Sequence, residues 1–457
     1  MPTVVFLATW ITIPLGPCAA LLVVLAVVAV VRRRRLDAAL PLGPLLLPII
    51  AIAGLWTVFA GLGHWVYANA DWVVRDAVLR DLVVDPWPVH YAIDGVDFLM
   101  RAPIGYFLPA ALVGRAFGLD AGEFALFAWT VLGVAIVFAM MLRDRPPLPR
   151  ALVRIVIFIA FSGMDVVGQY LHLKPVQLGE HLEWWAFLFQ YSSQTTQLFW
   201  VPNHALPGWI AVAWMVSQED RPASTTVAIL FVLFAPLWSP LTAIGIAPLA
   251  AVVIVRQWIG DGLRRAASSL LDWRMLVPLA ACLMLVYPYL VAGGDQVASG
   301  SNADARWVGE DFFARYVEFL AIECAGFAIL LLRRDPRDAL VWMGVLVLAL
   351  LPIYRFGPYN DLAMRGSIPA LTLLAIRMGE WLSTRMVFKR DGIARIVGIV
   401  LLVIGAVTPL MEFVRAFGTP WSLNPAASLI DVTRGTHYIT ESDRPWIKRV
   451  LRPPAGP

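Results

Sequence analysis

Residues 4–35 read VVFLATWITIPLGPCAALLVVLAVVAVVRRRR, a long apolar segment that runs directly into four arginines. A helix needs about 20 apolar residues to cross the roughly 30 Å of hydrocarbon in a bilayer. The segment 4–31 is therefore predicted to span a membrane. The arginines that follow it are an orientation signal, because basic residues gather in cytoplasmic loops.

The rest of the chain has the same character. Its 457 residues are 60% hydrophobic and only 15% charged, whereas an ordinary soluble domain is about 45–50% apolar and about 25% charged. This composition excludes a water-soluble enzyme, a disordered scaffold and a fibrous protein. Cys18, Cys282 and Cys324 have neither metal-binding nor disulfide spacing. We therefore predict a polytopic membrane protein with cysteines that are small buried hydrophobes.

Apolar segments of this kind recur along the whole chain. We predict an all-α membrane helical bundle with about twelve transmembrane helices. The predicted spans are 4–31, 38–62, 122–142, 152–171, 200–217, 224–236, 241–257, 275–292, 313–332, 338–354, 366–385 and 394–413.

The arginine clusters give this bundle an orientation. They begin at Arg32, Arg143, Arg256, Arg333 and Arg385, and alternation of the spans places all of them on one side, the cytoplasm. The outer side then carries the loops 63–121, 172–199, 293–312 and 355–365. We divide the chain into a transmembrane domain, 1–413, and a short outer tail, 414–457.

The first outer loop, 63–121, is predicted to hold interfacial helices. Residues 98–118 are apolar but contain two arginines and two prolines, so they are read as an interfacial or re-entrant helix rather than a span. Residues 71–84 carry a helical amphipathic pattern that Pro86 ends. Asp71 stands at the expected N-cap of that helix. It is either a helix cap or a general base at the membrane edge, with Asp76 in reserve.

Further polar residues lie in the later outer loops. His204 begins a span between Pro202 and Pro207, and it could bind a phosphate or sugar hydroxyl or be an ordinary hydrogen-bonded histidine. Arg355 and Arg365 lie on the outer side, where they could bind phosphate or snorkel towards lipid headgroups. The candidate substrate-binding residues are Arg365, Arg355, His204, Asn360, Asp361, His90 and Glu180.

Two classes of ligand are not expected. The chain contains neither GxxxxGK[ST] nor GxGxxG, so we predict no nucleotide cofactor. Its arginines lie in short clusters between apolar runs, which favours membrane lipid rather than nucleic acid as a partner.

Several short stretches together resemble the GT-C superfamily of integral-membrane glycosyltransferases. They are Asp71-Trp72 with the helix after it, Trp87-Pro-Val-His-Tyr91, Tyr106-Phe-Leu-Pro-Ala-Ala, Trp200-Val-Pro-Asn-His-Ala and Asn360-Asp-Leu-Ala-Met-Arg365-Gly-Ser-Ile-Pro369. Members of that superfamily use polyprenyl-phosphate-linked sugars on the non-cytoplasmic face and carry an acid in the first outer loop. By position the resemblance implies Asp71 as the base and Arg365 as a contact of the donor phosphate.

The chain also departs from that superfamily. It lacks an adjacent Asp-Glu or Glu-Asp pair in the first outer loop, has an extra span before that loop, and has no large C-terminal domain.

The resemblance implies an inverting glycosyltransferase in the bacterial inner membrane. It would move a sugar from a polyprenyl-phosphate donor to a glycan, lipid or protein acceptor at the periplasmic face. A divalent metal is neither implied nor excluded, and no metal ligand is assigned. Two alternatives stay open. One is a polysaccharide polymerase or ligase using lipid-linked glycan, which would rely on outer arginine and histidine. The other is a transporter or flippase of lipid-linked substrates, for which Asp165, Glu318 and Glu323 within predicted spans are the relevant residues.

Overall fold

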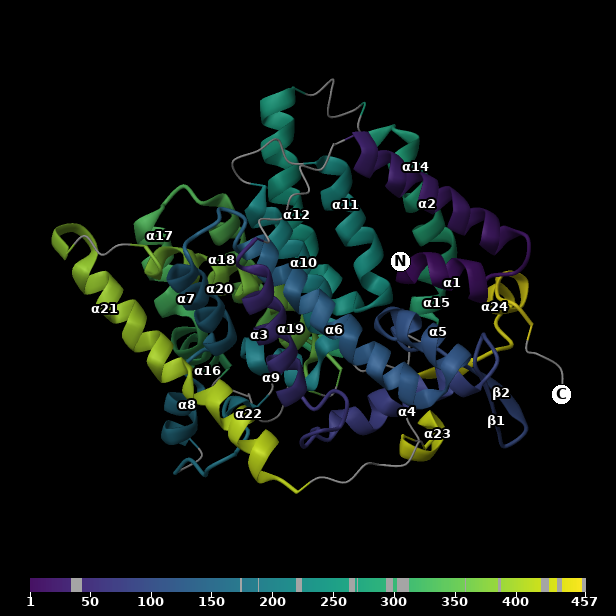
Figure 1. Ribbon diagram of the computed structural model, residues 1–457, viewed down its shortest axis with the longest axis horizontal. Helices are drawn as coiled ribbons and strands as arrows, with labels where there is room; N and C mark the ends of the chain where they lie inside the picture. Colours follow the sequence, from purple (N-terminus) through teal and green to yellow (C-terminus); the bar gives the residue numbers. More distant parts are fainter. Residues whose placement is uncertain are drawn as a thin grey trace.

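The computed structural model is mostly helical (Figure 1). It describes residues 1–33, 43–172, 175–187, 189–218, 224–262, 268, 270–292, 299–301, 312–357, 359–384, 388–420, 427–433 and 438–453.

The helices of the first half are α1 (Pro2–Trp10), α2 (Leu15–Arg33), α3 (Leu46–Phe59), α4 (Asp71–Val84), α5 (Leu108–Phe117), α6 (Leu119–Met141), α7 (Leu148–Ala160), α8 (Asp165–His172), α9 (Gln194–Trp200), α10 (Pro202–Ser217) and α11 (Thr225–Phe234). Those of the second half are α12 (Pro240–Asp261), α14 (Trp273–Ala281), α15 (Tyr287–Val291), α16 (Phe312–Leu320), α17 (Gly326–Arg334), α18 (Ala339–Leu350), α19 (Asp361–Gly366), α20 (Ile368–Leu382), α21 (Phe388–Gly405), α22 (Val407–Gly418), α23 (Leu429–Val432) and α24 (Pro445–Val450). The strands are β1 (His90–Ile93), β2 (Val96–Met100), β3 (Ser299–Ser301), β4 (Tyr354–Phe356) and β5 (Ile439–Glu441).

Six helical segments in the described part of the chain are long and apolar enough to cross a membrane. They are Leu15–Arg32, Leu119–Met141, Leu148–His172, Pro240–Gly260, Trp273–Val291 and Gly392–Gly418. The chain is therefore a helical membrane protein. Five of the twelve predicted spans coincide with these segments, and the first, 4–31, overlaps one of them in part. The other six predicted spans are not confirmed. Their helices are shorter, such as the 14 residues of α3, or more polar, such as α10 with Asn203 and His204.

The first predicted span, 4–31, is wrong as a single helix. The chain leaves the helix at Ile11 and starts a second one at Leu15. Gly16 allows the turn, because a Cβ there would lie 2.3 Å from the carbonyl oxygen of Leu7. Only α2 is long enough to span.

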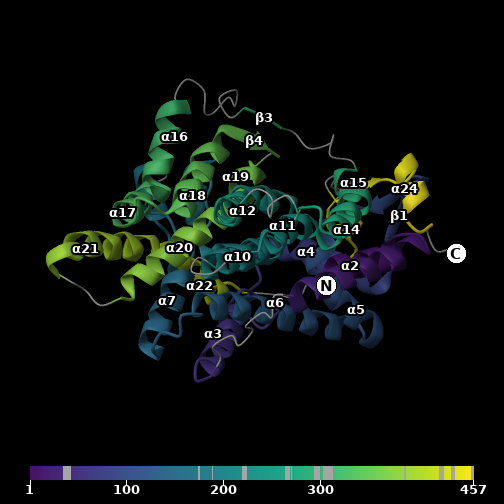
Figure 2. The same ribbon diagram turned by 90° about the horizontal axis from the view of Figure 1, so that it is seen from above.

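Helices α10 and α20 form the centre of the bundle, with α6, α7, α12 and α18 around them (Figure 2). Aromatic rings join α10 to two neighbouring helices, α3 and α7. The ring of Trp209 on α10 stacks on Trp56 at 5.5 Å and meets Phe158 edge-on at 5.2 Å. Such ring pairs contribute about 0.5–1.5 kcal/mol beyond the area they bury. These contacts hold α10 against α3 and α7.

The first outer loop folds together with the C-terminal tail. Strands β1, β2 and β5 form an antiparallel sheet in that order, with Phe98 opposite Glu441. The buried carboxylate of Asp81 on α4 accepts hydrogen bonds from Tyr91 Oη at 2.7 Å and from the backbone N–H of Leu429 at 2.9 Å. The tail therefore packs on the loop. This small sheet is absent from the all-α prediction.

The region 98–118 is not a span in the structure. It contains the end of β2, a 3₁₀ turn over Ile104–Tyr106 and the ten-residue helix α5. At about 1.5 Å per residue, α5 is only half as long as the hydrocarbon core is thick. Helix α4 spans residues 71–84, the bounds that the sequence predicts.

Candidate functional site

A cavity of about 750 Å³ lies where α4, the α9–α10 junction, the segment 181–192 and α19 meet. Its polar lining residues are Asp71, His181, Gln190, Ser192, Thr196, Asp361 and Arg365, and its other lining residues are Trp184, Phe187, Trp200, Val201, Tyr359 and Met364. Three of the predicted site residues, Asp71, Asp361 and Arg365, thus line one cavity although they come from distant parts of the chain.

Asp71 is the first residue of α4. The predicted N-cap assignment is wrong, because Ala70 occupies the cap position and no side chain caps this helix. On either side of Asp71, Asn69 Nδ2 and Trp72 Nε1 both donate to the carbonyl of Phe199 on α9, at 2.8 and 2.9 Å. These two bonds fix the start of α4 against the α9–α10 junction. The Asp71 carboxylate, whose side chain is 43% exposed, pairs with Arg75 at 3.2 Å.

Behind the cavity wall, a chain of hydrogen bonds runs from this ion pair to α19. Arg75 Nε donates to Asn203 Oδ1 at 3.4 Å, and Asn203 Nδ2 contacts His204 Nε2 at 3.3 Å. His204 Nδ1 lies 2.7 Å from Ser239 Oγ, which donates to Thr242 Oγ1 at 2.7 Å. The Thr242 hydroxyl lies 3.3 Å from the carbonyl of Arg365. Asp71 and Arg365 are thus joined by one polar network.

Arg365 is positioned by α19 and by the helix beneath it. Its Nη2 lies 3.0 Å from Asp361 Oδ1, one turn earlier. Asn360 precedes the helix with a left-handed φ of 54° and is fully buried. Below, a Cβ on Gly245 of α12 would lie 2.0 Å from the carbonyl oxygen of Gly366. Only glycine allows α12 to approach the α19 backbone this closely.

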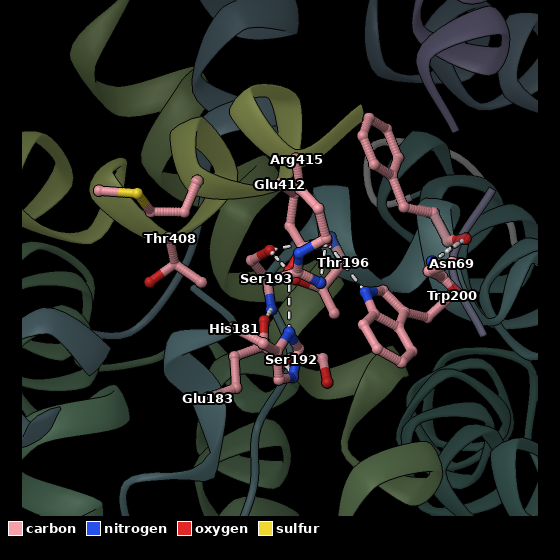
Figure 3. A network of polar contacts seen from close by, with 12 residues as sticks. Asn69, His181, Glu183, Ser192, Ser193, Thr196, Trp200, Thr408, Glu412 and Arg415 are labelled. Atoms are coloured by element: carbon pink, nitrogen blue, oxygen red, sulfur yellow. Dashed lines mark hydrogen bonds and ion pairs between the residues drawn. The ribbon is translucent and has the colours of Figure 1, made fainter. Parts of the chain in front are cut away.

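His181 forms the opposite wall of the cavity with a buried acid (Figure 3). Its Nδ1 lies 2.8 Å from Oε1 of Glu412, a residue of α22. The other oxygen of Glu412, Oε2, accepts hydrogen bonds from Trp200 Nε1 at 2.9 Å and from Arg415 Nη1 at 3.3 Å. Glu183 lies on the other side, with Oε2 3.9 Å from His181 Nε2. An imidazole between two carboxylates is a proton-holding group at the cavity wall.

The surroundings of His181 and Glu183 shift both pKa values upward. Burial lowers the pKa of His181, but the hydrogen bond to Glu412 and the charges of Glu183 and Glu412 outweigh burial and raise it. Burial raises the pKa of Glu183 to about 7, partly opposed by His181. Both groups therefore favour their protonated forms more than they would in water.

The other predicted site residues do not line this cavity. Asp76 pairs with His64 at 3.4 Å, and His90 contacts Asp97 at 2.9 Å in the sheet. Glu180 accepts from Gln169 Nε2 at 2.9 Å. Arg355 lies in β4, opposite Gly300. His204 belongs to the network behind the wall, where both ring nitrogens have partners.

Sequence reasoning missed His181, although the loop that contains it is visibly rich in aromatic and amide residues. The aromatic residues there are explained equally well by a membrane interface, and Glu412 is 231 residues away. One local signal was available, because His181 lies between two acids, Glu180 and Glu183.

The acids of the cavity do not form a metal centre of known type. Asp71 and Asp361 are each paired with an arginine. Among the residues that the structure describes, no group of three or more His, Cys, Asp or Glu side chains is arranged to hold a metal ion. We therefore derive no step through a metal.

Comparison with protein-family models, curated proteins and solved structures gave no match to this chain.

Proposed function

We propose that this protein is a membrane glycosyltransferase of the GT-C type, which moves a sugar from a polyprenyl-phosphate donor to an acceptor hydroxyl in the cavity of about 750 Å³. One observation carries the proposal: the acid of the first loop and an arginine of a late helix line the same cavity, between aromatic walls. The bacterial inner membrane and a periplasm-facing cavity belong to this proposal and rest on the arginine clusters.

Each of these residues has a role that suits its contacts. The Arg365 guanidinium has five N–H donors in a fork, so the pair with Asp361 orients it and leaves donors for a phosphate. Trp184 and Tyr359 line the cavity with exposed rings, which suit the apolar face of a sugar. Asp71 lines the cavity and its side chain is partly exposed, so its carboxylate can reach the hydroxyl of an acceptor.

The reaction is a single displacement. The acceptor oxygen attacks the anomeric carbon and gives its proton to Asp71 as the bond from that carbon to the phosphate oxygen breaks. The polyprenyl phosphate leaves with the electron pair, next to Arg365. The configuration of the anomeric carbon is inverted, and no general acid is required because phosphate is already a good leaving group.

A polysaccharide polymerase or ligase is the second candidate function. It is favoured by His181, which lines the cavity together with Arg365 and is backed by Glu412. In that case the substrates are lipid-linked glycans and the imidazole, rather than Asp71, takes the proton.

Transport is the third possibility, and it rests on three acids within predicted spans. Asp165 accepts hydrogen bonds from Ser162 and Thr408 at 2.8 and 2.9 Å, and Glu323 accepts one from Trp185 at 2.9 Å. Glu318 pairs with His172 at 2.8 Å. Each of the three acids therefore has at least one partner within the fold, and we do not propose a transporter.

The decisive experiment compares three variants of the full chain in proteoliposomes that contain a panel of polyprenyl-phosphate sugars. Asp71→Asn should reduce transfer to a soluble or lipid acceptor by about 10²–10⁴-fold, the usual loss for a general base. Asp76→Asn is the matched control, since it lies on the same helix outside the cavity, and it should transfer normally.

His181→Gln separates the two candidate functions. If Asp71→Asn keeps full activity and His181→Gln is inactive, the result contradicts the glycosyltransferase and supports the polymerase or ligase. Binding of polyprenyl phosphate, measured alongside by native mass spectrometry, should be unchanged in Asp71→Asn. Unchanged turnover in both variants would refute both functions.

A further inference from the structure

A second cavity, of about 790 Å³, lies at the opposite end of the central helices. Val201, just before α10, lines the first cavity, whereas Ser217, the last residue of α10, lines the second. Likewise Arg365 precedes α20, and Trp381 lies near its end. A 15-residue helix such as α20 is about 22 Å long, so the two cavities are separate sites.

This second cavity is strongly basic. Six arginines and four acids line it. The arginines are Arg143, Arg154, Arg256, Arg334, Arg337 and Arg377. Four of the six belong to three of the predicted arginine clusters, and the fold gathers them around one space with Arg154 of α7 and Arg377 of α20.

Three of the four acids contact two of the arginines, Arg154 and Arg377. Asp144 forms two bonds with Arg154, at 2.6 and 2.8 Å, and the Arg154 side chain is only 9% exposed. Asp338 and Glu380 both contact Arg377, at 3.0 and 2.9 Å. The acids thus hold the inner arginines in place, while the whole lining retains an excess of positive charge.

The ring of Trp381 orients Arg334, one of the exposed arginines of this cavity. The Arg334 guanidinium lies over the ring of Trp381 at 5.8 Å, and Arg395 lies over the same ring at 5.9 Å. Arg395 is itself fixed by two hydrogen bonds to Thr384, at 2.9 and 2.7 Å. The stacking holds the guanidinium in a defined orientation, and a guanidinium is a planar fork of N–H donors that matches phosphate oxygens.

We propose that this cavity binds a phosphate group, carried by the headgroup of an anionic phospholipid or by a small soluble phosphate. Guanidinium forks from several helices match the oxygens of a phosphate better than a single carboxylate. The setting favours the lipid source, because Ile329 and Trp342, on the adjoining helices α17 and α18, expose 57% and 53% of their surface. Basic pockets between membrane helices are typical headgroup sites on the cytoplasmic side. The inference is independent of the proposed glycosyl transfer, which uses the other cavity.

A purely structural role for these arginines is the rival explanation. Helices α6, α10, α17 and α20 end near this cavity, and arginines at helix C-termini offset the helix dipole. If the arginines only offset helix dipoles, their side chains would be expected to fill the space between the helix ends. Instead they surround a volume of about 790 Å³.

The test uses the full-length protein in nanodiscs of phosphatidylcholine, with and without phosphatidylglycerol. Arg256 and Arg337 are exposed, so the double variant Arg256→Gln/Arg337→Gln should fold. The matched control is Arg150→Gln/Arg333→Gln, which removes the same charge from exposed arginines at the same end that do not line the cavity. Native mass spectrometry counts retained phosphatidylglycerol, and a thermal-shift titration with inorganic pyrophosphate measures binding of a soluble phosphate.

We expect the cavity variant to weaken binding at least tenfold while the control variant binds like the wild type. If the selective loss occurs with phosphatidylglycerol, the ligand is a headgroup; if it occurs only with pyrophosphate, the ligand is a soluble phosphate. Equal losses in the two double variants, or no loss with either probe, would overturn the proposal.

Discussion

Nδ1 of His181 lies 2.8 Å from Oε1 of Glu412, although 231 residues separate the two in the chain. The contact ties the segment before α9 to helix α22, and it places an imidazole on the wall of the first cavity. Glu183 completes the group, since its Oε1 accepts from the backbone N–H of Ser193 at 2.8 Å. These buried acids and the histidine make the protein's stability depend on pH.

The first prediction is that stability falls as pH rises from about 5 to 8. Burial raises the pKa of Glu183 from its ordinary value of 4.5 to about 7, so the folded state holds a proton that the unfolded chain releases. The pKa of His181 is also raised from 6.5, so the folded state loses further stability as the pH rises above 6.5. By linkage, a group with a raised folded pKa stabilises the fold at low pH and loses that contribution as pH rises through its folded value.

Glu183→Gln isolates the carboxyl. A neutral amide carries no charge to bury, so this variant should be more stable than the wild type at pH 8 and should flatten the pH profile between 5 and 7. Thermal unfolding in detergent at several pH values measures both effects. A Glu183→Gln protein that melts below the wild type at pH 8 would contradict the assigned direction.

The second prediction concerns the phosphate contact in the proposed donor site. Arg365→Lys keeps the charge but loses the fork, and it should weaken binding of polyprenyl phosphate by about 1–3 kcal/mol, the range for hydrogen bonds to charged groups. Arg355→Lys is the control. Arg355 is also an arginine of the predicted outer loop, but it lies in β4 outside the cavity. Native mass spectrometry of the two variants compares them directly, and equal affinities would remove Arg365 from the site.

A third prediction tests how α12 positions α19. Gly245→Ala should destabilise the fold by about 1–3 kcal/mol, the usual cost of overpacking, because its Cβ would lie 2.0 Å from the Gly366 carbonyl oxygen. A shift of Gly366 should also reduce phosphate binding, because Arg365 directly precedes Gly366 in the chain. Gly260→Ala, on the same helix with open space around it, should be neutral or stabilising by up to about 1 kcal/mol. Similar melting temperatures for both variants would exclude this tight contact.

The sequence predicted those parts of the fold that depend on neighbouring residues. Helix α4 has the predicted bounds, 71–84, because its amphipathic pattern and the proline after it are local signals. The split of 4–31 at Ile11 was not predicted, because both halves are apolar and hydropathy alone cannot separate a hairpin from one long helix. The sheet of β1, β2 and β5 was missed for a different reason, since β5 comes from the distant C-terminal tail.

In the candidate site, too, the residues with a local signal were predicted and those that depend on distant partners were not. Asp71, Asp361 and Arg365 were found from their positions after or before apolar segments, and the fold brings them to one cavity. His90, Glu180 and Arg355 were selected by residue type within the same loops, yet other partners hold them elsewhere. His181 was not selected because its importance rests on Glu412, and a pairing across most of the bundle leaves no trace in local sequence.

The last prediction is the topology. Arginines from three predicted inner clusters line the second cavity, and predicted outer-loop residues line the first, at the other end of α10 and α20. The positive-inside rule assigns the arginine end to the cytoplasm. Cysteines placed at Arg150 and Arg333 should therefore react with a membrane-impermeant maleimide only after the membrane is opened. Those placed at Asp94 and Asp443 should react in intact spheroplasts.

The labelling experiment needs a starting protein whose own cysteines do not react. Cys282 and Cys324 are buried, as predicted, but the prediction is wrong for Cys18, which is exposed. A Cys18→Ser protein should therefore react little with the maleimide. All four labelled positions are exposed in the fold, so a difference in labelling reports the side of the membrane rather than burial. Labelling of position 150 from outside would invert that end of the bundle. It would place the arginine-lined cavity at the outer surface, and the cavity of Asp71 and Arg365 would then face the cytoplasm, where a periplasmic glycosyl transfer could not take place.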